Sequence, residues 1–222
     1  MATTRVVLVG GGGHASDVLG VLEECNLRDR RYDVVAGLDD DPDSVDRVRF
    51  GARGVAYRAF RADSLDALDR TGLRFLSAIG YPASRLAMAE RAVALGLEPL
   101  DPVIHPGAVW IATGVELGAG TVIHAGASVG VYARIGMHGY VSHGALVGHD
   151  SVLGDGAAVM PGASLSGGVR LGRGVMVGSG AVILEGLAVG DGARIGANAV
   201  VTKDVAAGAT VVGIPAQPRT GG

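Results

Sequence analysis

The chain has 222 residues, of which 48% are apolar, and its 22 acidic and 19 basic residues give a net charge of −3. The scattered basic residues argue against a nucleic-acid partner, and a single cysteine, Cys25, excludes an intrachain disulfide framework. Every apolar run falls short of the roughly 20 residues of a membrane helix and the start lacks a signal-peptide pattern, so we expect a cytoplasmic protein without a membrane span.

The first hundred residues predict a small α/β domain. Residues 5–10 are an apolar strand, and a glycine turn leads into a helix on which Val18, Leu22 and Cys25 share one face. Further strands are predicted at 33–41 and 74–80, with a helix at 83–96. We therefore expect residues 1–100 to form a Rossmann-like unit.

Gly10, Gly12 and Ala15 satisfy the G-x-G-x-x-A dinucleotide fingerprint, and Asp39 follows at a distance suited to a ribose contact. The strand pattern ends near residue 96, which leaves no residues for the second half of an NAD-binding fold. Half of a Rossmann fold suits one nucleotide, whose phosphates approach the backbone at a helix N-terminus. A nucleotide diphosphate sugar fits this description.

From Ile111 onward the sequence repeats every six residues. The first residue of each block is Ile, Leu or Val in all sixteen blocks through Val201, and the fourth is Gly in eleven of them. Asp150, Asn198 and Asp204 also occupy fourth places, and Gly, Asn and Asp are the residues that tolerate positive φ. A short strand and a corner every six residues predict a triangular prism with the first and fifth residues inside.

This repeat resembles that of the hexapeptide-repeat acyltransferases, which form left-handed parallel β-helices and homotrimers. The tail at 198–218 resembles the end of that fold. Two further segments, VGHDSVLGD (147–155) and VGGGGHASDV (9–18), resemble one branch of the family. That branch contains the sialic acid O-acetyltransferases and the N-acetyltransferases of nucleotide-linked 4-amino sugars, of the bacillosamine-pathway type. The resemblance implies that residues 101–222 bind acetyl-CoA, without a metal, between subunits. It also implies that the protein acetylates the amino group of a 4-amino-4,6-dideoxy sugar and that this reaction belongs to polysaccharide biosynthesis.

The same resemblance implies particular substrate contacts in the N-terminal domain. Gly12, Gly13 and His14 lie on the phosphate side, Asp39 and Asp40 reach the base or ribose, and Gly80 is a backbone contact. The alternative is that the glycines only make a tight turn and the aspartates only solvate a strand end.

His149, at the third place of its block, matches the general base of the family. An imidazole accepts a proton near neutral pH because its ordinary pKa is about 6.5. Asp150 matches the acidic residue that raises the basicity of that histidine, since a nearby carboxylate stabilises imidazolium. The alternatives are an exposed surface histidine and an aspartate that is simply tolerated at a corner.

For the cofactor, the resemblance implies contacts from Ser179 and Ala197, which are eighteen residues apart and therefore stack. Gly167 stacks over His149 in the same way, and its N–H is a candidate oxyanion donor. All three residues are alternatively ordinary corners. A histidine that contacts coenzyme A in the bacillosamine-type enzyme is replaced here by Ala158.

Of the other histidines, His143 occupies the neighbouring corner and is a candidate for a role in another subunit's groove of the trimer. His138, His124 and His105 are expected to be structural. His138 and His143 also have the separation of a ligand pair in γ-class carbonic anhydrases, which leaves a zinc enzyme as a remote alternative. A sugar O-acetyltransferase and a non-catalytic sugar-binding regulator remain open as well, and the sequence does not distinguish UDP, GDP and dTDP carriers.

Overall fold

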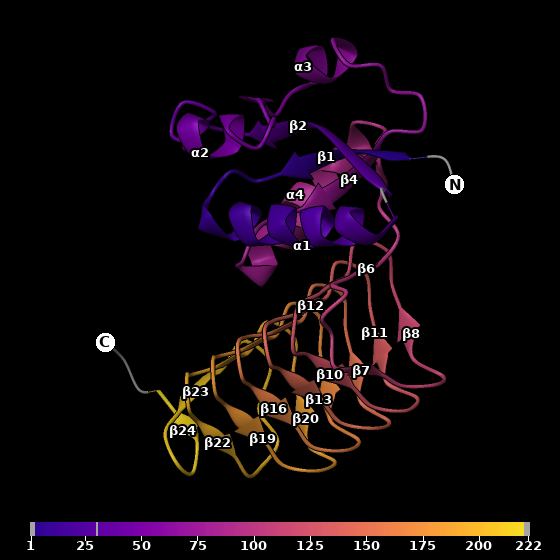
Figure 1. Ribbon diagram of the computed structural model, residues 1–222. Coiled ribbons are helices and arrows are strands. Elements are labelled where there is room, and N and C mark those ends of the chain that lie inside the picture. The colour runs from indigo at the N-terminus through magenta and orange to yellow at the C-terminus, as the bar shows by residue number, and fades with distance from the viewer. Residues whose placement is uncertain (1–2, 30, 220–222) are drawn as a thin grey trace. The chain divides into compact units, whose positions relative to one another are not determined.

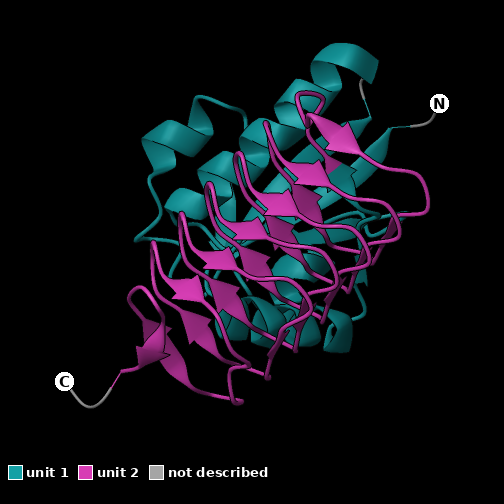
Figure 2. Ribbon diagram, turned by 90° about the horizontal axis from the view of Figure 1, so that it is seen from below, with its two compact units in different colours: residues 1–103 teal, residues 104–222 magenta. Residues whose placement is uncertain are grey.

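The computed structural model describes residues 3–29 and 31–219, and the chain divides into two compact units, residues 1–103 and residues 104–222 (Figure 2). Each unit is described by itself. Within the described ranges, no helix has both the length and the apolar character needed to cross a membrane.

Unit 1 contains one parallel five-stranded sheet in the order β3-β2-β1-β4-β5, accompanied by four helices (Figure 1). Its strands are β1 (Thr4–Val9), β2 (Tyr32–Asp39), β3 (Tyr57–Ala59), β4 (Arg74–Ser77) and β5 (Glu98–Pro99). Its helices are α1 (Gly13–Asp29), α2 (Arg47–Gly51), α3 (Ala62–Asp66) and α4 (Pro82–Ala94). β1 is central, and its apolar side chains from Val6 to Val9 are fully buried.

This unit differs in three respects from the predicted elements. Helix α1 begins at Gly13, so the last glycine of the turn already belongs to the helix. Residues 42–73, for which no element is predicted, add α2, the short strand β3 and α3. The sheet also continues past residue 96 into β5. Strands of two or three residues carry too little apolar alternation to be found from sequence.

Unit 2 is a left-handed parallel β-helix whose coils repeat every eighteen residues, as in the pairing of Val129 with Val147. One face of the prism contains β7 (Trp110–Ile111), β10 (Ser128–Val129), β13 (Leu146–Val147), β16 (Ser164–Leu165), β19 (Val182–Ile183) and β22 (Val200–Val201). A second contains β8 (Glu116–Leu117), β11 (Arg134–Ile135), β14 (Val152–Leu153), β17 (Arg170–Leu171) and β20 (Ala188–Val189). The third contains β6 (Val103–Ile104), β9 (Val122–Ile123), β12 (Tyr140–Val141), β15 (Ala158–Val159), β18 (Met176–Val177), β21 (Arg194–Ile195), β23 (Thr210–Val212) and the antiparallel β24 (Gln217–Pro218).

The interior of the prism is the predicted set of first and fifth residues. Val147, Leu165 and Ile183 stack as first residues and Ala145, Ala163 and Ala181 as fifth residues, and all six belong to one buried apolar cluster. Small fifth residues paired with branched first residues fit the narrow triangular section. The predicted periodicity is therefore confirmed.

The corners have the predicted left-handed backbone. All eleven fourth-place glycines have positive φ, and so do Tyr132, His138, Asp150 and Asn198. Asp204 is an exception: it is absent from the positive-φ positions, and its Oδ1 instead accepts a hydrogen bond from the N–H of Ala188. The prediction for Asp204 was wrong because the last coil already departs from the repeat there.

A second set of glycines occupies the second place of many blocks. A Cβ on Gly148 would lie 2.5 Å from the carbonyl carbon of Ser166, and one on Gly154 would lie 2.7 Å from the backbone nitrogen of Arg173. Real Cβ atoms do not approach backbone so closely. These glycines let successive coils stack at the usual strand spacing of about 4.8 Å.

Candidate active site

The corner residues of the prism form vertical columns that hydrogen bonds connect from coil to coil. The N–H of Gly168 donates to the carbonyl of His149, and the N–H of Gly186 donates to the carbonyl of Gly167. His149 and Gly167 are therefore successive third-place residues of one column, which we call the histidine column, as the spacing predicts.

His149 and Asp150 interact directly at this corner. The Nδ1 atom of His149 lies 2.8 Å from Oδ2 of Asp150, and 60% and 62% of the two side chains are exposed. When Nδ1–H donates to the carboxylate, the lone pair of a neutral ring resides on Nε2. Asp150 also has φ 56°, so one residue both forms the left-handed corner and orients the histidine.

Gly167 provides the space in which the imidazole lies. A Cβ added to Gly167 would be 2.4 Å from Nε2 and 2.5 Å from Cε1 of His149. Because no side chain fits there, the ring packs directly against the Gly167 backbone. Nε2 therefore lies beside the Cα of Gly167.

Ser179 and Ala197 belong to a different column. Hydrogen bonds connect its members in order, from Gly162 N–H to His143, from Gly180 N–H to Pro161 and from Asn198 N–H to Ser179. This second column, which we call the serine column, thus contains His143, Pro161, Ser179 and Ala197. Within residues 3–29 and 31–219, the N–H groups of Gly167, Ser179 and Ala197 donate to no acceptor.

In the third column, side chains occupy two of the backbone donors. Oδ1 of Asp155 accepts the N–H of Met137, and Oδ1 of Asp191 accepts the N–H of Arg173, both at 2.8 Å. The two carboxylates thus accept third-place backbone N–H groups, whereas the equivalent N–H groups of Gly167, Ser179 and Ala197 have no acceptor within the described residues. Side chains therefore cover part of the third column, whereas those three N–H groups remain open on the other two.

The remaining histidines have local partners. His138 has φ 55° and is 5% exposed, as a corner residue would be, and Nδ1 of His105 accepts the N–H of Gly107. His124 is fully buried and contacts His143, which sequence reasoning did not anticipate. Nothing in the repeat predicts that contact, because His124 is a second-place residue and the repeat predicts only that such residues lie outside the prism interior. Among the described residues, no group of three or more His, Cys, Asp or Glu side chains could hold a metal ion.

In unit 1 the glycine turn is open toward solvent. A Cβ on Gly12 or Gly13 would meet nothing within 4 Å, and one on Gly80 would lie 3.6 Å from Nδ1 of His14. Gly80 and His14 therefore lie side by side next to the turn. The start of α1 at Gly13 places backbone N–H groups and the positive end of the helix dipole here.

Asp39 stabilises this turn through two hydrogen bonds. Its Oδ2 accepts the N–H of Gly11 at 2.7 Å, and its Oδ1 accepts the N–H of Asp41 at 2.9 Å. Asp40 instead pairs with Arg91 at 2.5 Å on the surface. Of the two predicted aspartates, Asp39 is thus part of the turn, whereas the carboxylate of Asp40 is directed at a cation of α4.

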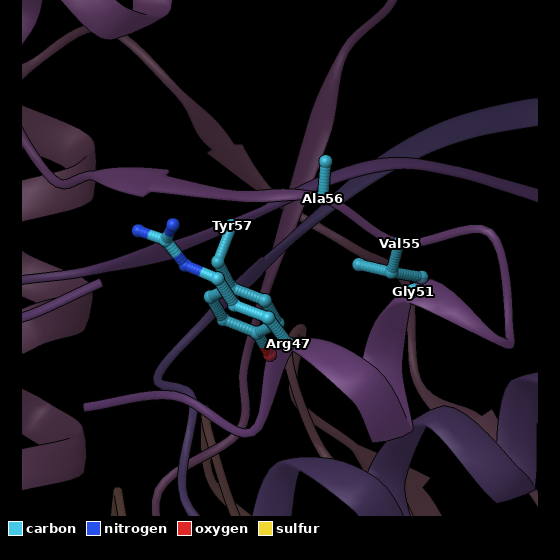
Figure 3. Close-up of a pocket in the computed structure, with 5 residues that line it drawn as sticks. All are labelled: Arg47, Gly51, Val55, Ala56 and Tyr57. Carbon is cyan, nitrogen blue, oxygen red and sulfur yellow. The ribbon is translucent and has the colours of Figure 1, made fainter. Parts of the chain in front are cut away.

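A pocket of about 320 Å³ opens nearby in unit 1, lined by Arg47, Gly51, Val55, Ala56 and Tyr57 (Figure 3). The hydroxyl of Tyr57 donates to the carbonyl of Gly10, and a Cβ on Gly11 would lie 3.0 Å from its ring. Burial, together with the negative charge of Asp39, raises the pKa of Tyr57. This side chain connects the pocket to the glycine turn, and sequence analysis did not identify it because its strand has only three residues.

The comparisons with known proteins agree with this geometry. The family model described as bacterial transferase hexapeptide (six repeats) matches residues 150–185 and 168–203. No curated protein matches the chain significantly.

Solved structures match over almost the whole chain. PerB from Caulobacter crescentus, solved with CoA and GDP-perosamine, is 32% identical with a TM-score of 0.84, and the match covers 99% of both chains. The acetyltransferase domain of PglB from Neisseria gonorrhoeae, solved with acetyl coenzyme A, is 30% identical with a TM-score of 0.84, covering 98% of this chain and all of that one. WeeI from Acinetobacter baumannii, at 22% identity and a TM-score of 0.65, shares the fold. The chain belongs to the hexapeptide-repeat, left-handed β-helix acyltransferases.

Proposed function

We propose that the protein transfers the acetyl group of acetyl-CoA to the amino group of a nucleotide-linked sugar, of the 4-amino-4,6-dideoxy class. The observation that carries this proposal is the His149–Asp150 pair lying against Gly167 on an open corner of the prism. Relatives of at least 30% identity that were solved with GDP-perosamine or acetyl coenzyme A support the choice of substrates.

In the proposed mechanism His149 acts as general base. The sugar amine attacks the thioester carbonyl while Nε2 of His149 accepts its proton, and Asp150 stabilises the imidazolium that forms. The thiolate of coenzyme A leaves and the amide bond remains. The open N–H of Gly167 stabilises the negative charge that develops on the carbonyl oxygen.

Acetyl-CoA is proposed to lie between two copies of the chain. The catalytic residues His149 and Gly167 lie on one column, whereas the proposed cofactor contacts Ser179 and Ala197 lie on another edge of the same prism. An extended ligand that touches both columns needs the histidine column of one copy to face the serine column of the next. We therefore propose a homotrimer with three such grooves.

Residues 1–100 are proposed to bind the nucleotide part of the acceptor. The open Gly12–Gly13 turn and the N-terminus of α1 suit the diphosphate, with His14 and Gly80 beside it. Asp39, which holds the turn, is proposed to contact the ribose, and the pocket beside Tyr57 is proposed to receive the base. Asp40 is proposed to contribute through its pair with Arg91. Residues 101–222 then supply the acetyl-CoA site, and we place this activity in the cytoplasm and in polysaccharide biosynthesis.

The test is release of free coenzyme A from acetyl-CoA with GDP-, UDP- and dTDP-linked 4-amino sugars, comparing the wild type with His149→Ala. We expect turnover with one amino sugar and a loss in the variant of about 10²- to 10⁴-fold, the usual contribution of a general base. Sialic acid is included as a hydroxyl acceptor. Turnover with sialic acid alone, or nucleotide-sugar binding without turnover, would refute N-acetylation.

A further inference from the structure

His143 and His124 form a pair of imidazoles outside the His149 site. Nε2 of His143 lies 3.3 Å from Nδ1 of His124, and the ring centroids are 4.4 Å apart. The rings of Tyr140 and His124 pack edge to face, with centroids 4.8 Å apart. His124 and Tyr140 are 0% and 3% exposed, whereas His143 is exposed at its corner.

This contact determines which nitrogen His143 can offer to a ligand. One of the two facing nitrogens must donate and the other must accept, and in either arrangement Nε2 of His143 is engaged. Nδ1 is then the nitrogen that remains for a ligand. The rigid packing of His124 against Tyr140 holds the His143 ring in one orientation.

The columns show where His143 lies relative to the proposed chemistry. His143 is a member of the serine column, two coils below Ser179 and three below Ala197. At about 4.8 Å per coil, these separations are roughly 10 and 14 Å along the prism axis. Gly167, on the histidine column, is likewise one coil above His149. The proposed coenzyme A contacts therefore lie on the C-terminal side of the base, whereas His143 precedes His149 by only a third of a coil and lies at about the level of the base.

We propose that His143 binds the acceptor sugar nucleotide, facing His149 of the adjacent copy, and that His124 is its positioning residue. This assignment rests on the proposed function, because it uses the facing of the two columns across a subunit groove. Acetyl-CoA occupies the groove from His149 toward the C-terminus, which leaves the groove at the level of His143 for the acceptor. The ligand atom is an oxygen of the acceptor, either on the diphosphate or on the sugar ring.

The experiment measures direct binding by calorimetry, together with steady-state kinetics, on the intact protein. The ligands are GDP-perosamine, GDP alone and coenzyme A, with a UDP-linked 4-amino sugar and UDP in place of the first two if the wild type prefers them. The variants are His143→Ala and His124→Phe, which keeps an aromatic ring but removes the nitrogen that faces His143. Arg134→Ala, which alters an exposed ion pair with Glu116, serves as the control.

We expect His143→Ala to weaken binding of the sugar nucleotide and to raise its KM by about tenfold, the usual loss for a hydrogen bond to a polar or charged ligand. Binding of coenzyme A should stay within about twofold. His124→Phe should shift the acceptor KM in the same direction by a smaller factor, and Arg134→Ala should leave all constants unchanged. A parallel loss of GDP affinity would assign the contact to the diphosphate, and an unchanged GDP affinity would assign it to the sugar.

Unchanged acceptor binding in His143→Ala would overturn the assignment, and so would an equal weakening of acceptor and coenzyme A. His143→Ala changes an exposed side chain, so it keeps the test decisive if His124→Phe does not fold. Binding without turnover by the wild type would refute only the proposed reaction, and the binding comparison would still decide the role of His143. A wild type that binds neither sugar nucleotide would refute both.

Discussion

The substitution Gly167→Ala separates the packing of His149, the proposed general base, from the rest of the site. The added Cβ would lie 2.4 Å from Nε2 of His149, so the ring has to rotate away from its contact with Asp150. Gly167 is not among the positive-φ glycines, and alanine keeps the amide N–H. The fold and the proposed oxyanion donor should therefore remain intact.

The expected loss follows from the displaced hydrogen bond. A hydrogen bond to a charged group contributes about 1.5–3 kcal/mol, so kcat/KM should fall by about 10- to 100-fold. The assay is coenzyme A release, with thermal unfolding measured in parallel. Gly20→Ala, in helix α1, is the control for a glycine-to-alanine change, because its Cβ would have only ordinary contacts.

A double-mutant cycle with His149→Ala tests the reasoning directly. If Gly167→Ala acts through the histidine, it should cause little further loss once the imidazole is absent. Wild-type activity in Gly167→Ala would show that the ring does not need this space. An undiminished effect in the His149→Ala background would show that Gly167 acts independently of the base.

Three further outcomes are expected. Asp150→Asn keeps a side chain that tolerates the left-handed corner but removes the carboxylate, so kcat should fall by about tenfold while the unfolding temperature stays unchanged. Asp150→Gly should have the same effects. A lower unfolding temperature in either variant would indicate a structural role for Asp150. Gly154→Ala should lower the free energy of unfolding by about 1–3 kcal/mol in denaturant titration, because the new Cβ meets the backbone of the next coil, whereas destabilisation no larger than that of Gly20→Ala would contradict the stacking explanation. Burial raises the pKa of Cys25, so less thiolate is present at pH 8 than in an unperturbed thiol; alkylation should therefore be slow at pH 8 and accelerate as the pH rises further, and Cys25→Ala should keep full activity.

The prism could be predicted almost completely from the sequence. Its interior depends on a local rule, that first and fifth residues share one face, and its corners depend on residues that accept positive φ. The prediction failed at Asp204, where the chain leaves the repeat, and it did not include the positive φ of Tyr132. Neither departure has a local sequence signal, since an aspartate is compatible with a corner and a tyrosine is not typical of one.

The candidate site was predictable only in part. The eighteen-residue spacing correctly placed His149 beneath Gly167 and Ser179 beneath Ala197, because vertical neighbours follow from the coil length. The carboxylate contact of Asp150 with His149 was expected from the family resemblance alone, and the hydrogen bond from the glycine turn to Asp39 was not expected. Both depend on side-chain direction, which the sequence does not encode locally. The pair of Asp40 with Arg91 joins residues fifty-one apart in the chain.

The amino-acid sequence by itself determined the repeat, the interior of the prism and the vertical order of its corner residues, because each depends on backbone geometry within a few residues or on a fixed period. Only the tertiary structure decided which corners keep open N–H groups, which nitrogen of His149 faces Asp150, and that a buried His124 supports His143. Those features arise where side chains from different coils or strands meet, and their contacts depend on packing in three dimensions that no local pattern specifies.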